Sequence, residues 1–331
     1  MPATAGASDT EIDQWVRREA GADVLHWQPI PGDASPRRYH RLVFDGCTRV
    51  LMDASAEPAS CAPFAQVAAL LREVGVHAPE VLAWEQTRGW MLLEDLGERS
   101  YLEALRREPP DALIEAALTT LVRWQASSRP GVLPAYDRAR LAAELALFPD
   151  WYVARHLGYA LTPAQRQTWD ALADALVTAA LAQTQVFVHR DFMARNLLVG
   201  AAGPGVIDFQ DAVYGPVTYD VASLLRDAFI SWPDDQTEAW ALFYWEAARR
   251  AGIAVPTRPE DFLRDLDWMG TQRHLKVLGI FARLKHRDGK PRYLEEAPRF
   301  LGYLDAAIRR RGDLAPLGAL LAELHADVST A

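Results

Sequence analysis

The sequence predicts an α+β protein of two lobes, with a small antiparallel sheet in the first lobe and mainly helices in the second. Strand signals are concentrated in residues 26–93, and helical periodicity dominates after residue 97. At 331 residues the chain also exceeds the usual size of one domain. We therefore expect an amino-terminal lobe of residues 1–96 and a carboxy-terminal lobe of residues 97–331.

The first lobe is expected to begin with a helix and to continue with strands. Ser8 and Glu11 form a capping-box pattern, which predicts a helix that extends to about Ala20. Apolar residues at helical spacing predict another helix over residues 63–74, and the Asp-Gly pair at 45–46 predicts a tight hairpin. Strands are expected at residues 26–30, 38–44, 49–53, 81–84 and 90–93. Together they predict a small antiparallel sheet.

The second lobe is entered through LEDLG (93–97), where the strand pattern stops. Ser100 and Glu103 form a capping box there, and Thr162 followed by Pro163 and a Gln predicts another helix start. Helices are expected at residues 110–127, 219–230, 235–250, 259–284 with breaks, and 297–311.

Two segments carry the residues expected to do chemistry. VFVHRDFMARNLLV (186–199) contains Asp191 and Asn196, and GVIDFQDAVYGPVTYD (205–220) contains Asp208. The Gly/Pro-rich turn between them predicts a hairpin that brings Asn196 close to Asp208. In a phosphoryl-transfer site one Asp accepts the proton of the substrate hydroxyl, while an Asn and a second Asp hold metal ions. The spacing predicts a kinase; the alternative is that these side chains only cap helices or close turns.

The same segments resemble the catalytic and metal-binding loops of the aminoglycoside phosphotransferase and choline kinase family, a small-molecule branch of the protein-kinase-like fold. Asp220 matches the Asp that braces the catalytic loop in this family. PGDASPRRYHRL (31–42), RVLMDAS (49–55) and residues 208–232 and 272–295 are similar, more narrowly, to its anomeric amino-sugar kinases of bacterial cell-wall recycling. The resemblance implies a bilobal kinase-like fold, ATP and Mg2+ as cofactors, and phosphorylation of the anomeric hydroxyl of N-acetylmuramate and N-acetylglucosamine.

The predicted site residues fall into three groups. Asp191 is the expected base and lies against the acceptor, and Asn196 and Asp208 are the expected metal ligands because hard oxygen donors suit magnesium. By resemblance, backbone groups of Glu94 to Leu96 hydrogen-bond the adenine. The expected sugar-lining side chains come from the segment after the metal ligand and from the later helix, and they are Gln210, Asp211, Tyr214, Gln272, Arg273, His274 and Lys276. Arg273 is the predicted partner of the N-acetylmuramate carboxylate, with a solvated helix face as the alternative.

Two departures from the general kinase pattern affect the phosphate site. The first hairpin lacks Gly-x-Gly-x-x-Gly, so phosphate contacts are expected from backbone N–H groups of residues 33–35, from the Ser35 hydroxyl, or from Arg37 and Arg38. Asp53 occupies the place where kinases carry the phosphate-binding Lys. We expect Arg38 or Arg41 on the neighbouring strand to supply the missing charge; the alternative is that both are solvated side chains at a strand edge.

Composition bounds the other possibilities. The formal net charge is −9 and no long Lys/Arg run is present, which argues against nucleic acid or an anionic membrane as partner. Two cysteines are too few for a disulfide framework, and no targeting or membrane-spanning segment is evident, so a cytoplasmic location is expected. The expected partner is a small amino sugar, with no obligate protein partner evident.

Three other functions stay open. The chain could be a kinase of another alcohol, such as an aminoglycoside, choline or homoserine, although the basic stretch KVLGIFARLKHRDGKPR favours a neutral or anionic substrate. The missing Lys could mark a pseudokinase that binds nucleotide without turnover. A metal-dependent hydrolase is disfavoured, because no second His/Asp cluster at ligand spacing is present.

Overall fold

The computed structural model describes residues 9–31, 36–201 and 203–328. The chain forms two compact units. Unit 1 comprises Met1–Ala104 and Arg195–Asp211, and unit 2 comprises Leu105–Ala194 and Ala212–Ala331. Residues 195–211, which belong to the expected carboxy-terminal lobe (97–331), thus lie in unit 1. The division at residues 96 and 97 stays a prediction.

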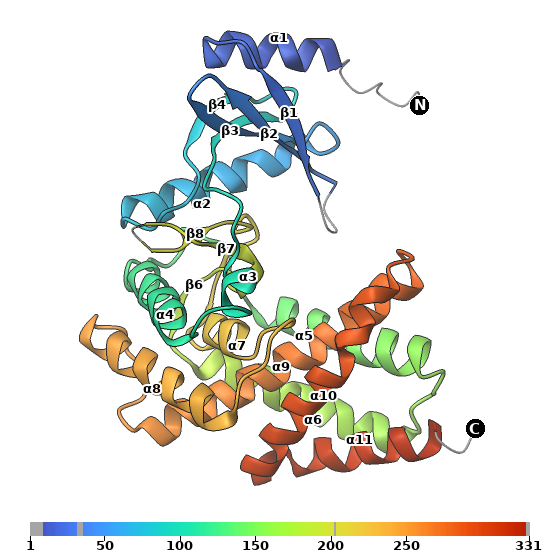
Figure 1. The fold of residues 1–331 in the computed structure, drawn as a ribbon. Helices are drawn as coiled ribbons and strands as arrows, with labels where there is room; N and C mark the ends of the chain where they lie inside the picture. The colour runs from blue at the N-terminus through green and yellow to red at the C-terminus, as the bar shows by residue number, and fades with distance from the viewer. Residues whose placement is uncertain (1–8, 32–35, 202, 329–331) are drawn as a thin grey trace. The chain divides into compact units, whose positions relative to one another are not determined.

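Unit 1 contains a five-stranded antiparallel sheet with the strand order β1-β2-β3-β5-β4. One face is covered by α1 (Asp9–Ala20) and the other by α2 (Cys61–Glu73) (Figure 1). Trp15 and Val16 of α1 belong to one buried cluster with Leu42 and Leu51 of the sheet. The strands are β1 (His26–Ile30), β2 (Arg38–Phe44), β3 (Cys47–Asp53), β4 (Val81–Glu85) and β5 (Trp90–Glu94).

A short hairpin completes unit 1. β7 (Leu197–Leu198) pairs with β8 (Gly205–Val206), as the Gly/Pro-rich turn predicts. The Val206 N–H donates to the carbonyl of His77 at 2.7 Å, so the hairpin is fixed to the segment that follows α2. This backbone contact explains why residues so late in the sequence belong to unit 1.

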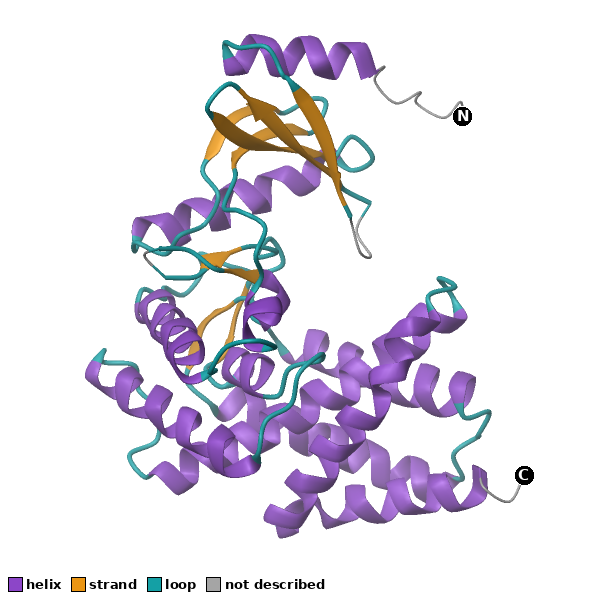
Figure 2. Ribbon diagram, in the orientation of Figure 1, coloured by secondary structure: helices purple, strands orange, loops and turns teal. Residues whose placement is uncertain are grey.

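Unit 2 is mainly helical, with one two-stranded sheet (Figure 2). Its longest helix, α9 (Pro259–His286), packs on α6 (Pro163–Ala182) and on its neighbours α7 and α10. No helix of the described residues is long and apolar enough to cross a membrane. The other elements are α4 (Asp111–Ala126), α5 (Arg138–Leu145), a π-helix (Phe148–His156), β6 (Gln185–Val188), β9 (Val213–Pro216), α7 (Tyr219–Leu225), α8 (Asp234–Arg250), α10 (Ala297–Arg310) and α11 (Ala315–Val328). α3 (Tyr101–Leu105) spans the boundary, and 3-10 turns occupy Pro58–Ser60, Ala194–Asn196, Pro291–Glu296 and Gly312–Leu314.

The structure confirms most expected elements and corrects two of them. The capping box at Thr162 has both of its hydrogen bonds with Gln165. The breaks expected in the long helix are absent, because α9 is continuous, and α7 ends at Leu225, five residues before its expected end. The helices α5, the π-helix and α11 had no counterpart in the expected set.

Close packing in unit 2 depends on a glycine of α9. A Cβ built on Gly279 would lie 2.4 Å from the carbonyl carbon and oxygen of Leu147. The helix backbone therefore approaches the residue before the π-helix more closely than any larger residue allows.

Candidate active site

The β7–β8 hairpin brings the two expected metal ligands together. Asn196 directly precedes β7, and Asp208 follows β8 after one residue. The Asn196 side-chain amide donates to Asp208 Oδ2 at 3.3 Å, and the Ile207 N–H donates to the Asn196 carbonyl at 3.1 Å. The sequence expectation that the hairpin places these two side chains side by side is met within unit 1.

Asp208 has a backbone conformation that is uncommon outside glycine. Its φ is +64°, in the left-handed region. The next residue, Phe209, is fully buried, and its ring lies 4.8 Å from that of Phe64 in α2. Gln210 Nε2 donates to Asp208 Oδ1 at 3.0 Å. Such backbone conformations concentrate at functional sites, which agrees with the metal-binding role expected of Asp208.

The donor set at this turn fits a magnesium ion. Asn196 and Asp208 supply an amide and a carboxylate, and an amide can present its oxygen by a flip about its last torsion. Mg2+ is usually bound by one or two carboxylates together with substrate phosphates, and not by an all-protein cage. Among the described residues, no group of three or more His, Cys, Asp or Glu side chains is placed to hold a metal.

A cavity of about 1100 Å³ in unit 1 adjoins these ligands. Asn196 and Asp208 line it together with apolar side chains from the sheet and the hairpin, among them Val50, Leu93 and Ile207. Its size is that of a small-molecule or cofactor site. Of the residues predicted to bind the nucleotide, Arg41, Glu94 and Leu96 line this cavity, Arg38 does not, and Ser35 lies outside the described residues.

Residues 94–98, at the end of β5 and directly after it, form a linker, and the charged side chains of this linker are paired within unit 1. Glu94 accepts hydrogen bonds from Arg72 at 3.0 Å and from the Glu80 N–H at 3.2 Å. Burial alone would raise the pKa of Glu94, but its bonds to His77 and to the Glu80 backbone leave it lowered. Arg41 binds Asp95 with two hydrogen bonds of 2.6 and 2.9 Å, so its guanidinium ties β2 to the linker.

Strand parity separates Asp53 from the cavity. Successive side chains of a strand point to opposite faces. Val50 of β3 and Arg41 of β2 are paired in register and line the large cavity, whereas Asp53 and its register partner Arg38 line a different cavity of about 570 Å³ beside α1. Arg38 Nε donates to Asp53 Oδ2 at 3.1 Å. Asp53 therefore does not line the cavity that Asn196 and Asp208 line.

The catalytic loop in unit 2 is held by two buried carboxylates. Asp220 accepts the backbone N–H groups of His189 at 2.6 Å and of Arg190 at 3.0 Å. Asp227 accepts the N–H of Ala194 at 2.8 Å, at the other end of the loop. Burial raises the pKa of Asp220 to about 7 against the opposing effect of its two backbone bonds. The brace expected at Asp220 thus has a second member, Asp227, which sequence reasoning missed although an Asp before a turn is a usual Asx signal.

Arg190, next to Asp191, belongs to a largely buried network of ion pairs and hydrogen bonds. Its φ is +76°, and its guanidinium pairs with Glu144 of α5. Lys276 of α9 binds the same carboxylate at 3.1 Å and the Tyr219 hydroxyl at 2.9 Å. Burial acts to raise the pKa of Glu144, but the charges of Lys276 and Arg190 leave it lowered. Lys276, expected at the sugar, thus shares the Glu144 carboxylate with the residue before Asp191.

The other residues that were predicted to line the sugar site lie in different parts of the structure. Asp211 lines the unit 1 cavity together with Gln210, and Tyr214 lies in β9 with its ring 6.4 Å from that of Phe187. Arg273 and His274 are 2% and 1% exposed, which excludes the solvated-face alternative for Arg273. Gln272 is also buried, and its side-chain amide has no partner among the described residues.

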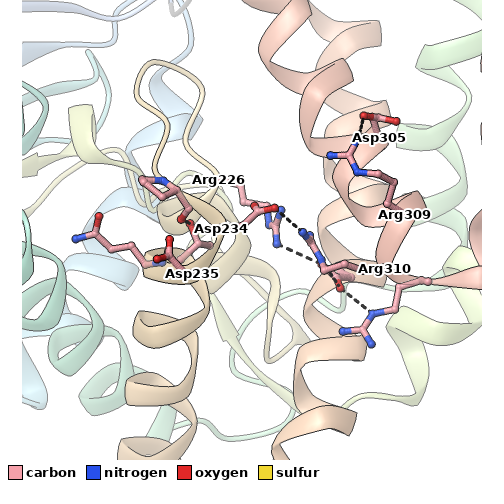
Figure 3. A network of polar contacts seen from close by, with 11 residues as sticks. Arg226, Asp234, Asp235, Asp305, Arg309 and Arg310 are labelled. Carbon is pink, nitrogen blue, oxygen red and sulfur yellow. Dashed lines mark hydrogen bonds and ion pairs between the residues drawn. The ribbon is translucent and has the colours of Figure 1, made fainter.

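Arg273 is part of an arginine-rich region at the end of α7. It donates to the carbonyl of Arg226 at 3.4 Å, and Arg226 in turn pairs with Asp267 of α9. Arg310 of α10 binds Asp267 at 2.9 Å and Asp234 at 3.0 Å (Figure 3). The ion pairs connect Arg226, directly after α7, to the three helices α8, α9 and α10 of unit 2.

Fold and loops together define a kinase-like phosphotransferase, and comparison with known proteins agrees. The chain belongs to the phosphotransferase enzyme family, whose pattern matches residues 26–262. A solved structure of an aminoglycoside 2'-phosphotransferase-IIIa in complex with GDP is similar in fold, with a TM-score of 0.62 and 13% identity over 89% of this chain and 98% of that one.

Sequence comparison narrows the family further. The chain is 52% identical over 296 residues to an N-acetylmuramate/N-acetylglucosamine kinase of Pseudomonas aeruginosa, covering 89% of this chain and 88% of that protein. It is 49% identical over 300 residues to the Neisseria meningitidis kinase of the same name, covering 89% of each. The narrower resemblance, stated from residues 31–42, 49–55, 208–232 and 272–295, is thereby confirmed.

Proposed function

We propose that this protein is an ATP-dependent kinase that phosphorylates the anomeric hydroxyl of N-acetylmuramate and N-acetylglucosamine in cell-wall recycling. The observation that carries the proposal is the 52% identity over 89% of the chain to a kinase of these two sugars. The family pattern matches residues 26–262, which include the whole catalytic segment, so the similarity is not confined to the scaffold. A neighbouring fold captured with GDP supports a nucleotide as phosphoryl donor.

The residues take distinct roles in this proposal. Asp191 accepts the proton of the anomeric hydroxyl and orients its oxygen for attack, because a loose transition state needs positioning more than full deprotonation. Asn196 and Asp208 hold magnesium, which when bound neutralises charge on the nucleotide phosphates. Asp220 and Asp227 fix the backbone of the loop that carries Asp191. The apolar lining of the unit 1 cavity, with Val50 and Leu93, accommodates the base.

A phosphorus NMR spectrum of the product from N-acetylmuramate, ATP and magnesium tests the proposal. We expect a phosphomonoester signal coupled to the anomeric proton, and no such product with the Asp191→Asn variant. A phosphate on another hydroxyl would reject the anomeric assignment. Stabilisation by ATP without turnover of either sugar would instead identify a nucleotide-binding pseudokinase, and turnover only of an aminoglycoside, choline or homoserine would identify a different acceptor.

A further inference from the structure

The unit 1 cavity has no lysine among its described lining residues, and the position expected to carry one faces away from it. Three arginines line the cavity: Arg37, Arg41 and Arg195. Arg41 is engaged by Asp95, Glu98 and the carbonyl of Gly97, so its charge is balanced at the linker. A phosphate chain in this cavity needs a cation that Arg41 does not provide.

Arg37 is placed on the correct face of the sheet. It immediately precedes β2, and by strand alternation it shares a face with Tyr39 and Arg41, both of which line the cavity. Arg37 Nε donates to the hydroxyl of Ser60 at 3.3 Å. Ser60 lies directly before α2, so the guanidinium is fixed between the first hairpin and the helix that packs under the sheet.

Tyr39 connects Arg37 with the metal ligands. Its phenol is mostly buried, and burial raises its pKa; the charge of Arg37 and a hydrogen bond to it act in the opposite direction, and the charge of Asp208 acts with burial. The charges of both Arg37 and Asp208 therefore act on the pKa of the Tyr39 phenol. Arg37, Tyr39 and Asp208 all line the cavity, so phosphates bound to a metal at Asp208 would share the cavity with the Arg37 guanidinium.

We propose that Arg37 is the cation that binds the phosphate chain of the nucleotide, in place of the β3 lysine of other kinases, and that Ser60 and Tyr39 position its guanidinium. The proposal rests on the proposed nucleotide-dependent function. An arginine can bind two phosphate oxygens at once through its planar fork, and a partly buried site screens this interaction less than water does. Arg37 was expected from the sequence only as one of several phosphate contacts, and it now takes the role for which Arg38 or Arg41 was expected.

Equilibrium binding separates a phosphate contact from a structural one. We measure dissociation constants for ATP, ADP and adenosine by calorimetry in the presence of magnesium, without sugar. For Arg37→Ala we expect the constants for ATP and ADP to rise at least about tenfold, which corresponds to about 1.4 kcal/mol, and that for adenosine to stay unchanged. Arg37→Lys should recover part of the loss, since an ammonium binds phosphate as a point charge.

Three matched variants complete the test. Arg49→Ala removes an arginine of the same sheet that does not line the cavity, and nucleotide binding should not change. Ser60→Ala should weaken ATP binding less than Arg37→Ala, because the guanidinium is kept. Equal losses for ATP and adenosine in Arg37→Ala, or a phosphate-dependent loss in Arg38→Ala instead, would overturn the proposal. If the unaltered protein binds no nucleotide, the proposed function itself fails.

Discussion

Arg190 combines an unfavourable backbone conformation with a favourable side-chain contact. A left-handed conformation costs a residue with a Cβ about 1–2 kcal/mol. The buried carboxylate of Glu144 offsets this cost by binding the guanidinium, and Lys276 shares the same carboxylate. The residue before the proposed base is thus held by its side chain in a position where glycine would be the default.

Two substitutions of Arg190 separate the backbone cost from the contact. Both Arg190→Gly and Arg190→Ala lose the pair with Glu144, but only alanine keeps the penalty for a positive φ. We expect the glycine variant to unfold with a free energy about 1 kcal/mol higher than the alanine variant, as measured by urea denaturation. Equal stabilities would mean that the loop relaxes to another conformation once the guanidinium is removed.

His274 is a buried residue whose charge state should matter for stability. It packs against Phe300 and Tyr303, and neither ring nitrogen has a hydrogen-bond partner among the described residues. Burial, with the nearby charges of Arg273 and Arg226, holds its pKa well below the usual value. The unfolded chain therefore takes up a proton near pH 6.5 that the folded protein does not, and stability falls as the pH drops below that value.

The variant His274→Phe tests this assignment. Removing two buried, unpaired nitrogen atoms should raise the free energy of unfolding by about 1 kcal/mol at pH 8. The advantage over the unaltered protein should grow between pH 7 and pH 5, as followed by chemical denaturation at each pH. A constant difference would contradict the pKa assignment. A higher Michaelis constant for the sugar without added stability would instead support the sugar contact predicted from the sequence.

At the scale of single elements, the breaks expected in the long helix α9 are absent. The helix was expected to contain breaks, yet it is continuous from Pro259 to His286. Gly279 allows the helix backbone to lie against Leu147 and does not end the helix. Periodicity along one segment carries no record of which neighbour will approach it, so this contact could not be predicted. The π-helix at Phe148–His156 was not predicted either. Pro149 lies at its start, and a proline there does not by itself distinguish a helix start from a loop.

Paired glycine substitutions measure how tight this contact is. Gly279→Ala should lower the free energy of unfolding by at least about 1–3 kcal/mol, because backbone atoms of Leu147 stand where the new methyl group would be. Gly302→Ala in α10 is the control, since nothing lies within 4 Å of its Cβ position and alanine favours helices. Thermal unfolding of both should give opposite shifts. A harmless Gly279→Ala would show that α9 can move away.

For the whole molecule, the sequence was most informative where spacing fixes geometry. The hairpin between Asn196 and Asp208 needs only a short turn, so the meeting of these side chains followed from local signals. Strands β1 to β5 were also placed to within two residues of their observed bounds. The face on which Arg37, Arg38 and Asp53 lie could not be read, because the register of a strand relative to its neighbours depends on the packing of both faces of the sheet.

Ligand-linked stability tests the molecule as a whole. A ligand that binds only the folded protein adds about 2.7 kcal/mol at one hundred times its dissociation constant. We expect ATP with magnesium to raise the melting temperature accordingly, and Asp208→Asn to lose the part of the shift that depends on magnesium. An Asp208→Asn protein that responds to magnesium like the unaltered one would remove this residue from the proposed metal site.

The orientation of Asp53 has a consequence for how such enzymes are classified. Kinase-like chains are commonly sorted into active and inactive members by whether a lysine stands at one alignment column. Here that column falls on a side chain that points beneath α1 and touches Arg38. A classification based on that column alone would count this protein as inactive, although its sequence keeps the expected catalytic-loop aspartate and both expected magnesium ligands. Screens for inactive kinases should therefore establish on which face of the sheet a charged side chain lies before they compare residue types at one aligned position.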